Sequence, residues 1–287
     1  MTVRQVEFDD SQLGNWGEDE RFEVTQERIT EYAKATNDPI PAHLAGEVAP
    51  PVFAIVPVFE SLMVPAVEVF PVAAIPRIVH GEQDFHFHRP IRPGDRLVSR
   101  ARMTGYESLE KGTRAAIVLE CRTEDGELVN EQYVTTFVRG MSPGRTVGEL
   151  APEHKFDESL RAAGPVATVA QHIDADQTFR YAPASGDPMP IHLDDEVARS
   201  TGLPGIIAHG LCTMAFTSWA VLTEVAGSDV SRLRRFAVRF ADLVLPGDDL
   251  ETRIYRRSAA DGYTTYQFET VRGDDPVITD GLAVIRD

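Results

Sequence analysis

The chain has 287 residues, of which 43% are hydrophobic and 25% are charged, values typical of a globular protein. Its formal net charge of −17 argues against nucleic acid or an anionic membrane surface as the main partner, because both repel an acidic protein. The length suggests two domains or one large one.

Targeting and redox signals are sparse. The first ten residues, MTVRQVEFDD, lack the apolar core of a secretory signal peptide. Two cysteines, Cys121 and Cys212, are too few for a disulfide framework, so a reducing compartment such as the cytoplasm is the expected setting. The most apolar stretch, residues 50–71, contains Glu60, Glu68 and several prolines. We expect it to be a buried helix with its flanks rather than a membrane span.

The chain contains an internal repeat. Residues 32–43 read YAKATNDPIPAH and residues 181–192 read YAPASGDPMPIH, so seven of twelve positions are identical at an offset of 149. Chance gives about one identity over such a length. Pro-Gly-Asp segments at 93–95 and 246–248 match at an offset of 153. We therefore expect one unit used twice, with domains of residues 1–150 and 151–287.

Each copy is predicted to open with a short helix, at about 25–36 and 174–184. Thr25 and Asp174 occupy equivalent positions at the two starts, and both residue types are good N-caps. The loop with the Asp-Pro-x-Pro-x-His pattern follows each helix.

A long apolar segment comes next in each copy, at about 52–69 and 209–225. Its Ala, Met, Phe and Leu content favours a buried helix. Pro57 and Pro65 should kink or shorten the version in the first copy.

Strands follow in both copies. They are predicted at 84–88, 96–106, 113–121 and 128–139, and again at 236–240, 250–257, 263–271 and 277–285. Asp125-Gly126 predicts a hairpin turn. Residues 140–170 show no sustained period and are expected to form a linker. A buried helix followed by a meander of long strands implies an α+β fold in which a sheet wraps around a helix.

The repeated loop carries a family resemblance. The segment SGDPMPIH at 185–192, followed by AHGL at 208–211, resembles the MaoC-like (R)-specific enoyl-thioester hydratases and 3-hydroxyacyl-thioester dehydratases. The segments HGEQ at 80–83 and HRPIRPGD at 88–95 resemble the degenerate N-terminal half of that family. The resemblance covers nearly the whole chain, is strongest to actinobacterial forms, and implies a double hotdog fold.

The resemblance also implies roles for particular residues. Hydration of an enoyl thioester needs two proton-transfer groups and a donor for the oxyanion that forms on the thioester oxygen. Asp187 and His192 are the implied acid/base pair, and the NH of Gly210, at the start of the long helix, is the implied oxyanion donor. The remaining motif residues are expected to contact the substrate: Ser185, Gly186, Met189 and His209. The family usually has Asn where this chain has Met189.

In the first copy, Asp38 and His43 repeat the acid/base pair. Asn37 replaces the glycine that precedes the aspartate, and Ala54-Ile55 stand where the second copy has His209-Gly210. We expect these two residues to form a vestigial site.

Two further clusters have alternative interpretations. Arg235 and Arg239 either bind the phosphates of the carrier or lie on the solvent face of a strand. His86 and His88 share a strand face with Asp84, which strand alternation explains without a metal ion. Cys212 is expected to be a small core residue.

The sequence therefore predicts a carbon–oxygen lyase acting on acyl thioesters of coenzyme A or acyl carrier protein, without cofactor or metal. One alternative is a non-catalytic acyl-thioester-binding subunit, which Met189 favours. A hotdog thioesterase is another, although the second long helix offers only Glu224 as an acid, near its far end. Either a monomer or a homodimer fits a duplicated unit.

Overall fold

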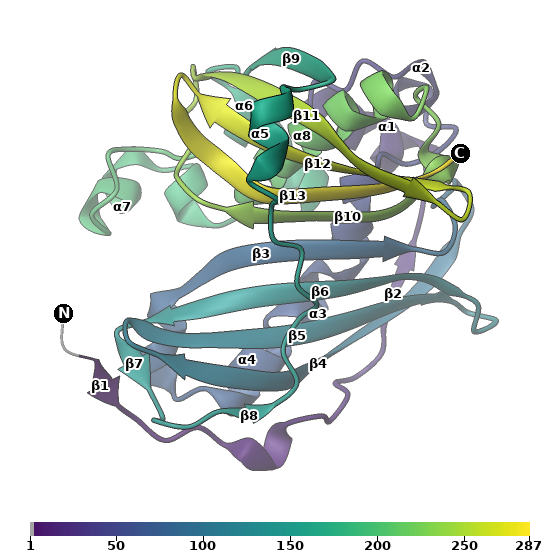
Figure 1. The fold of residues 1–287 in the computed structure, drawn as a ribbon. Coiled ribbons are helices and arrows are strands. Elements are labelled where there is room, and N and C mark those ends of the chain that lie inside the picture. Colours follow the sequence, from purple (N-terminus) through teal and green to yellow (C-terminus); the bar gives the residue numbers. More distant parts are fainter. Residues whose placement is uncertain (1–2) are drawn as a thin grey trace. The chain divides into compact units, whose positions relative to one another are not determined.

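The structure is a computed structural model that describes residues 3–287, and it combines helices with antiparallel sheet (Figure 1). Contacts between Cα atoms divide the chain into two compact units. The first holds the residues up to Phe22, Pro57–His86 and Arg96–Glu153, and the second holds Glu23–Val56, Phe87–Asp95 and His154–Asp287. The second unit thus contains the helix and loop of the first copy. The predicted domain bounds follow the repeat instead, and they stay a prediction.

The first unit is built on a curved sheet with the strand order β2-β4-β5-β6-β3. Its strands are β2 (Glu20–Glu23), β3 (Ile78–Phe87), β4 (Arg96–Leu109), β5 (Gly112–Thr123) and β6 (Leu128–Arg139). Three shorter strands are β1 (Arg4–Gln5), β7 (Met141–Ser142) and β8 (Val147–Gly148). The four predicted strands are confirmed, and Gly126 has the positive φ of 90° that its turn requires.

The apolar segment of the first copy is broken, as its prolines predict. It forms a 3-10 helix (Pro51–Val58) that contains Pro57, then α3 (Phe59–Leu62) and α4 (Val64–Val69), where Pro65 lies in the first turn. Among the described residues, Pro51–Val69 is the one segment long and apolar enough to cross a membrane, but 67% of its most apolar window is buried inside the structure. A core segment of a globular protein has the same character.

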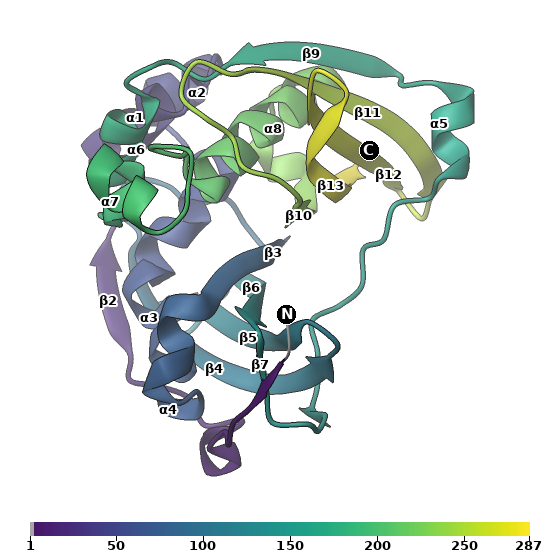
Figure 2. The same cartoon turned by 90° about the vertical axis from the view of Figure 1, so that its left-hand side faces the viewer.

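The second unit is a sheet curved around one long helix. Its antiparallel strands, in the order β10-β13-β12-β11-β9, are β9 (Ala167–His172), β10 (Leu233–Phe240), β11 (Asp249–Ala260), β12 (Tyr263–Arg272) and β13 (Asp275–Arg286). Helix α8 (Gly210–Val225) lies inside the curve and contacts β9, β10, β11 and β13 (Figure 2). The prediction of a buried helix enclosed by a strand meander is confirmed here.

Helices α1 (Gln26–Ala35) and α6 (Gln177–Ser185) open the two copies and pack against each other. Thr25 caps α1 by accepting the Arg28 NH at 3.2 Å. The expectation that Asp174 caps α6 is wrong, because Asp176 is the N-cap residue and Asp174 binds Arg180 instead. The three remaining short helices are α2 (Pro41–Leu44), α5 (Ser159–Ala163) and α7 (Asp195–Ser200).

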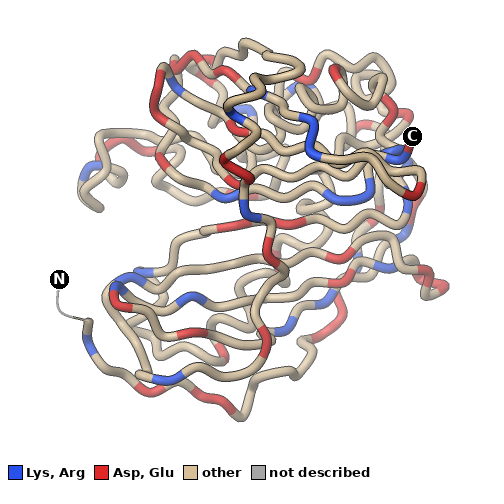
Figure 3. Tube along the Cα trace, viewed as in Figure 1, with Lys and Arg blue, Asp and Glu red and all other residues tan. Residues whose placement is uncertain are grey.

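The expected linker at 140–170 is not structureless. It contains β7, β8, α5 and the start of β9, which pairs with β11 through registers such as Thr252 with Val169. This pairing is long-range, so local periodicity does not reveal it. Acidic residues are distributed along much of the chain rather than gathered on one element (Figure 3).

Candidate active site

The loop that follows α6 places the predicted acid/base pair. Gly186 ends α6 in the left-handed conformation, with φ of 83°, and donates its NH to the Ala182 carbonyl at 2.9 Å. The chain then turns through Pro188 and reaches a short 3-10 helix, Pro190–His192. Glycine is needed at this position because its φ is one that L side chains rarely adopt.

Asp187 folds back onto its own loop. One carboxylate oxygen, Oδ1, accepts the Met189 NH at 3.0 Å, and the Asp187 NH donates to the Ser185 hydroxyl at 3.3 Å. Burial raises the pKa of Asp187 above its ordinary value, while the Met189 NH and the nearby His192 act in the opposite direction. The second carboxylate oxygen is left for other contacts.

His192 is held by the backbone. Its Nδ1 lies 2.8 Å from the Ile207 carbonyl oxygen, which can only accept, so Nδ1 carries the hydrogen and Nε2 presents a lone pair. Burial lowers the pKa of His192 below its ordinary value. The side chain is therefore a neutral base near pH 7.

His209 completes the cluster. Its ring stacks on His192 with centroids 3.8 Å apart and an interplanar angle of 26°. Its Nε2 donates to the Asp187 carbonyl oxygen at 3.3 Å, and its buried Nδ1 has no hydrogen-bond partner among the described residues. Burial, and then the neighbouring His192, lower the pKa of His209 to about 3, so this ring is also neutral.

Polar atoms of the three side chains lie close together. A carboxylate oxygen of Asp187 and one ring nitrogen each of His192 and His209 lie within 4.8 Å of one another. A point among atoms this close is at most about 2.8 Å from each of them, the length of a hydrogen bond. A water molecule or substrate hydroxyl placed among them would lie within hydrogen-bond distance of the carboxylate and the imidazoles.

A metal ion fits this group less well. Two imidazoles that ligate one ion must direct their lone pairs at it from about 2.1 Å. The rings of His192 and His209 are stacked, so lone pairs in their planes run nearly parallel instead of converging. The expectation of no metal stays a prediction, with this geometry in its favour.

Gly210 begins α8, and His209 is its N-cap residue. The NH of a first helical residue has no acceptor within the helix, and the helix dipole favours negative charge there. A Cβ added to Gly210 would lie 3.3 Å from two ring carbons of Phe240 on β10. A side chain at this position would therefore require a shift of the ring or of the helix start.

Comparisons with known proteins show which families the two halves of the chain resemble. A MaoC like domain matches residues 158–275, and a FAS1-like dehydratase domain region matches residues 11–132. The probable enoyl-CoA hydratase 2 of Dictyostelium discoideum is 29% identical over 211 residues, which are 72% of this chain and 70% of that protein. Matches to several other curated relatives cover 26% to 62% of their length.

Solved structures have the same fold. A MaoC-like dehydratase from Phytophthora capsici matches 97% of this chain and 99% of its own with a TM-score of 0.83 at 24% identity. A Mycobacterium tuberculosis protein described as a double hotdog matches 98% of this chain and 97% of its own with a TM-score of 0.62 at 14% identity.

The chain thus contains a MaoC like domain and a FAS1-like dehydratase domain region, in agreement with the resemblance noted in the sequence. Its predicted α+β double hotdog fold is confirmed.

The first copy of the loop has a different geometry. Asp38 Oδ2 lies 2.7 Å from His43 Nδ1, and Asp38 Oδ1 accepts the Ile40 NH at 2.8 Å. Both side chains are buried, and Nε2 of His43 has no hydrogen-bond partner among the described residues. Ala54 and Ile55 lie inside a 3-10 helix rather than at the start of a helix.

The residues predicted to contact the substrate differ in their exposure to solvent. Ser185 is buried, whereas Met189 is 52% exposed and reaches Asp187 through its backbone NH. Arg235 is half-buried on β10, and Arg239 is exposed next to Phe240. Because neighbouring residues of a strand face opposite sides, Arg239 points away from the side on which Phe240 packs against Gly210.

The histidines of β3 do not form a metal centre. His86 Nε2 lies 3.3 Å from Asp84 Oδ2, and burial lowers the pKa of His80 to about 4. Within residues 3–287, Asp187, His192 and His209 form the only group of three or more potential ligands that converge. Cys212 is buried in α8, where burial raises the pKa of its thiol, as expected of a core residue.

Sequence reasoning missed two contacts of the site. The Ile207 carbonyl that orients His192 is a backbone group 15 residues further along the chain, so no side-chain pattern marks it. Tyr181 packs its ring against His209, with centroids 4.9 Å apart. The repeat did contain a signal for this residue, since tyrosine opens both copies of the loop segment.

Proposed function

We propose that this protein is a carbon–oxygen lyase that interconverts (R)-3-hydroxyacyl and trans-2-enoyl thioesters in fatty-acid metabolism. The observation that carries the proposal is the proximity of Asp187 and His192 to His209, the residue directly before the first amide of α8. These are the two proton-transfer groups and the oxyanion donor that the reaction requires.

In the hydration direction, the water held by Asp187 and His192 adds its oxygen to Cβ of the substrate. The π electrons move toward the thioester, whose oxygen gains negative charge and is stabilised by the Gly210 NH. The pair accepts the proton released by the water and passes one proton on to Cα, so that the water supplies both the hydroxyl and the proton. The pair gains and loses one proton in total, and its two members titrate as a unit.

We propose coenzyme A as the carrier of the substrate, with acyl carrier protein as the second candidate. The name enoyl-CoA hydratase 2 of the Dictyostelium relative supports coenzyme A. Arg239, exposed on β10, is the candidate contact to its phosphates. Arg239→Glu should then raise KM for a coenzyme A thioester but not for the shorter pantetheine thioester. Arg256→Glu, at an exposed position on β11, is the matched control.

The competing interpretation is a non-catalytic acyl-thioester-binding subunit, which Met189 in place of the usual Asn favours. The Met189 backbone NH nevertheless contacts the Asp187 carboxylate, so this contact does not depend on the side chain. The two free, buried cysteines support a reducing compartment such as the cytoplasm as the place of action.

The deciding experiment is hydration of trans-2-enoyl-CoA substrates of short and medium chain length. The reaction is measured as the decrease in the absorbance of the enoyl thioester. We expect activity in the wild type and a loss on the order of tenfold to a hundredfold in Gly210→Ala, where the oxyanion donor is displaced. A wild type that is inactive with every coenzyme A and acyl-carrier-protein substrate would favour the binding subunit.

A further inference from the structure

Two buried tyrosines connect the first copy to the second. Tyr32 lies on α1 and Tyr181 on α6, and the hydroxyl oxygens of this tyrosine pair are 3.3 Å apart, a long hydrogen bond. Their ring centroids are 5.6 Å apart, and each side chain is at most 1% exposed. The pair occupies equivalent positions of the repeat, so each copy contributes one hydroxyl.

The tyrosine pair touches the active site on one side. The Tyr181 ring packs against His209 with an interplanar angle of 53°. His209 stacks on His192 and donates to the Asp187 carbonyl. Contacts therefore run without a gap from Tyr32 to both members of the acid/base pair.

The hydrogen bonds of this cluster are incomplete. Two hydroxyl groups carry two protons, and the bond between Tyr32 and Tyr181 uses one of them. Among the described residues, the second hydroxyl proton has no acceptor and Nδ1 of His209 has no donor. Buried polar groups without partners are costly, so the packing around these side chains must hold them in place against that cost.

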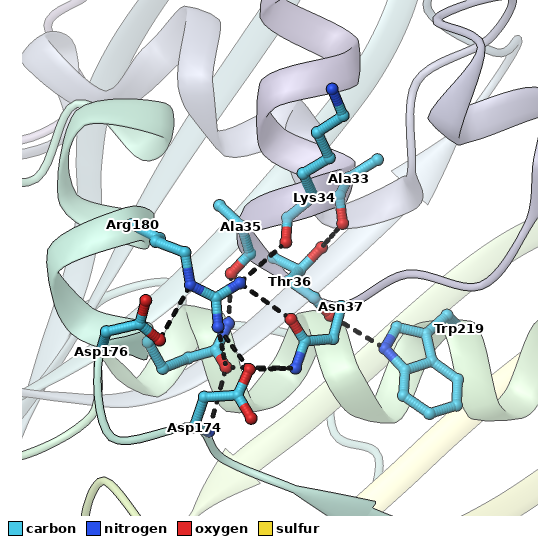
Figure 4. A network of polar contacts seen from close by, with 10 residues as sticks. Ala33, Lys34, Ala35, Thr36, Asn37, Asp174, Asp176, Arg180 and Trp219 are labelled. Atoms are coloured by element: carbon cyan, nitrogen blue, oxygen red, sulfur yellow. Dashed lines mark hydrogen bonds and ion pairs between the residues drawn. The ribbon is translucent and has the colours of Figure 1, made fainter.

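A polar network fixes α1 against the second copy (Figure 4). Arg180 donates to the Lys34 carbonyl at 3.1 Å and to Asn37 Oδ1 at 2.9 Å. Trp219 of α8 donates to the Thr36 carbonyl at 3.1 Å. These bonds hold the last carbonyls of α1, so the helix that carries Tyr32 has a fixed position relative to Tyr181.

We propose that Tyr32, a residue of the non-catalytic copy, is a positioning residue for the active site. Through Tyr181 it holds His209 against His192 and Asp187. The first copy thus contributes to catalysis although its own Asp38 and His43 are bonded to each other. This inference rests on the proposed lyase function.

The test removes single hydroxyls. Tyr32→Phe should lower kcat about tenfold with KM unchanged, because a small misplacement of acid/base groups slows the chemical step without weakening substrate binding. Tyr255→Phe is the matched control. It also loses one buried hydroxyl, bonded to Glu269 at 3.0 Å, and should keep wild-type kcat with a similar change in melting temperature.

A double-mutant cycle distinguishes positioning from general destabilisation. If the tyrosine pair acts as a unit, Tyr32→Phe/Tyr181→Phe should be no slower than Tyr181→Phe alone. Equal kcat in Tyr32→Phe and Tyr255→Phe, or losses that multiply in the double variant, would overturn the proposal. The hydration rates of the wild type and of Asp187→Asn are measured in the same series. An inactive wild type would contradict the lyase function itself, whereas an active wild type with unchanged Tyr32→Phe would contradict only the positioning role.

Discussion

The two copies of the loop share seven residues but use them differently. In the first copy, the side chains of Asp38 and His43 bond directly to each other at 2.7 Å. In the second copy, Asp187 bonds to the Met189 NH and His192 bonds to the Ile207 carbonyl. Both oxygens of Asp38 are bonded within the first loop, whereas among the described residues only one oxygen of Asp187 has a bonded partner.

The partner of the histidine Nδ1 therefore decides what the motif can do. When the aspartate takes that place, as in the first copy, both of its oxygens are bonded within the loop, and only the buried Nε2 of the histidine is left without a partner among the described residues. When a backbone carbonyl takes it, the tautomer is set and the aspartate stays available for a substrate or water. The same five-residue spacing gives side chains bonded to each other in one copy and two separately held side chains in the other.

The largest expected effect separates the two aspartates. Asp187→Asn should lower kcat by about 10²–10⁴, because it removes one group that transfers a proton. Asp38→Asn should leave kcat within about threefold of the wild type, because its carboxylate is bonded to His43 and does not reach the reacting molecule. Rates of enoyl-CoA hydration at saturating substrate measure both.

The control for these two variants is their melting temperature, which shows that each protein is folded at the assay temperature. A comparable loss in both variants would mean that the first copy holds a second working site or supports the first one through Asp38.

The histidines should show the opposite order when stability is measured. His43→Ala removes one partner of a fully buried pair and should cost about 3–5 kcal/mol. His192→Ala loses one hydrogen bond to a carbonyl and should cost about 1–3 kcal/mol. Urea unfolding of the two variants measures the difference, and a smaller loss in His43→Ala would contradict the structural role of that pair.

Only the second copy has a histidine at the start of its long helix, and this predicts a difference in pH dependence. The pKa of His209 is about 3 in the folded protein, whereas an unfolded histidine has about 6.5. As pH falls between these values, the unfolded chain binds a proton that the folded protein does not. Stability that is present above pH 6.5 is therefore lost toward pH 3, by up to about 1.4 kcal/mol per pH unit.

His209→Phe keeps a ring in the stack and should flatten this loss, as urea unfolding between about pH 7 and pH 4 will show. His172→Gln, at an exposed position of β9, is the control for removal of a histidine. If His209→Phe loses stability as steeply as the wild type, another group is responsible for the acid sensitivity.

The sequence alone predicts those features that depend on local patterns, because proline and apolar periodicity act over a few residues. These features are the repeat, the α+β fold, the buried helix α8 and the broken segment at Pro57. Strand β9 was missed, since its pairing with β11 joins segments about 80 residues apart. The positions of Asp187 and His192 could be named, but not the Ile207 carbonyl, since every residue carries such a group.

The smallest expected effect concerns the helices that carry the two tyrosines. Thr25 caps α1 with a side-chain bond to the Arg28 NH, whereas Asp176, the N-cap residue of α6, makes no such bond. Thr25→Ala should therefore cost about 1 kcal/mol. Asp176→Ala should cost only about 0.3–0.5 kcal/mol, because it loses one exposed ion pair to Arg180.

Urea unfolding of both variants under identical conditions measures this difference. Arg180 also bonds Asp174, so α6 keeps an anchor in Asp176→Ala that α1 lacks when Thr25 is replaced. Equal losses would show that the two helices are held by their packing against each other and not by their ends. In that case the packing of α1 against α6 alone would fix the position of Tyr32 next to Tyr181. The N-cap of α1 and the polar network would not be needed for this position.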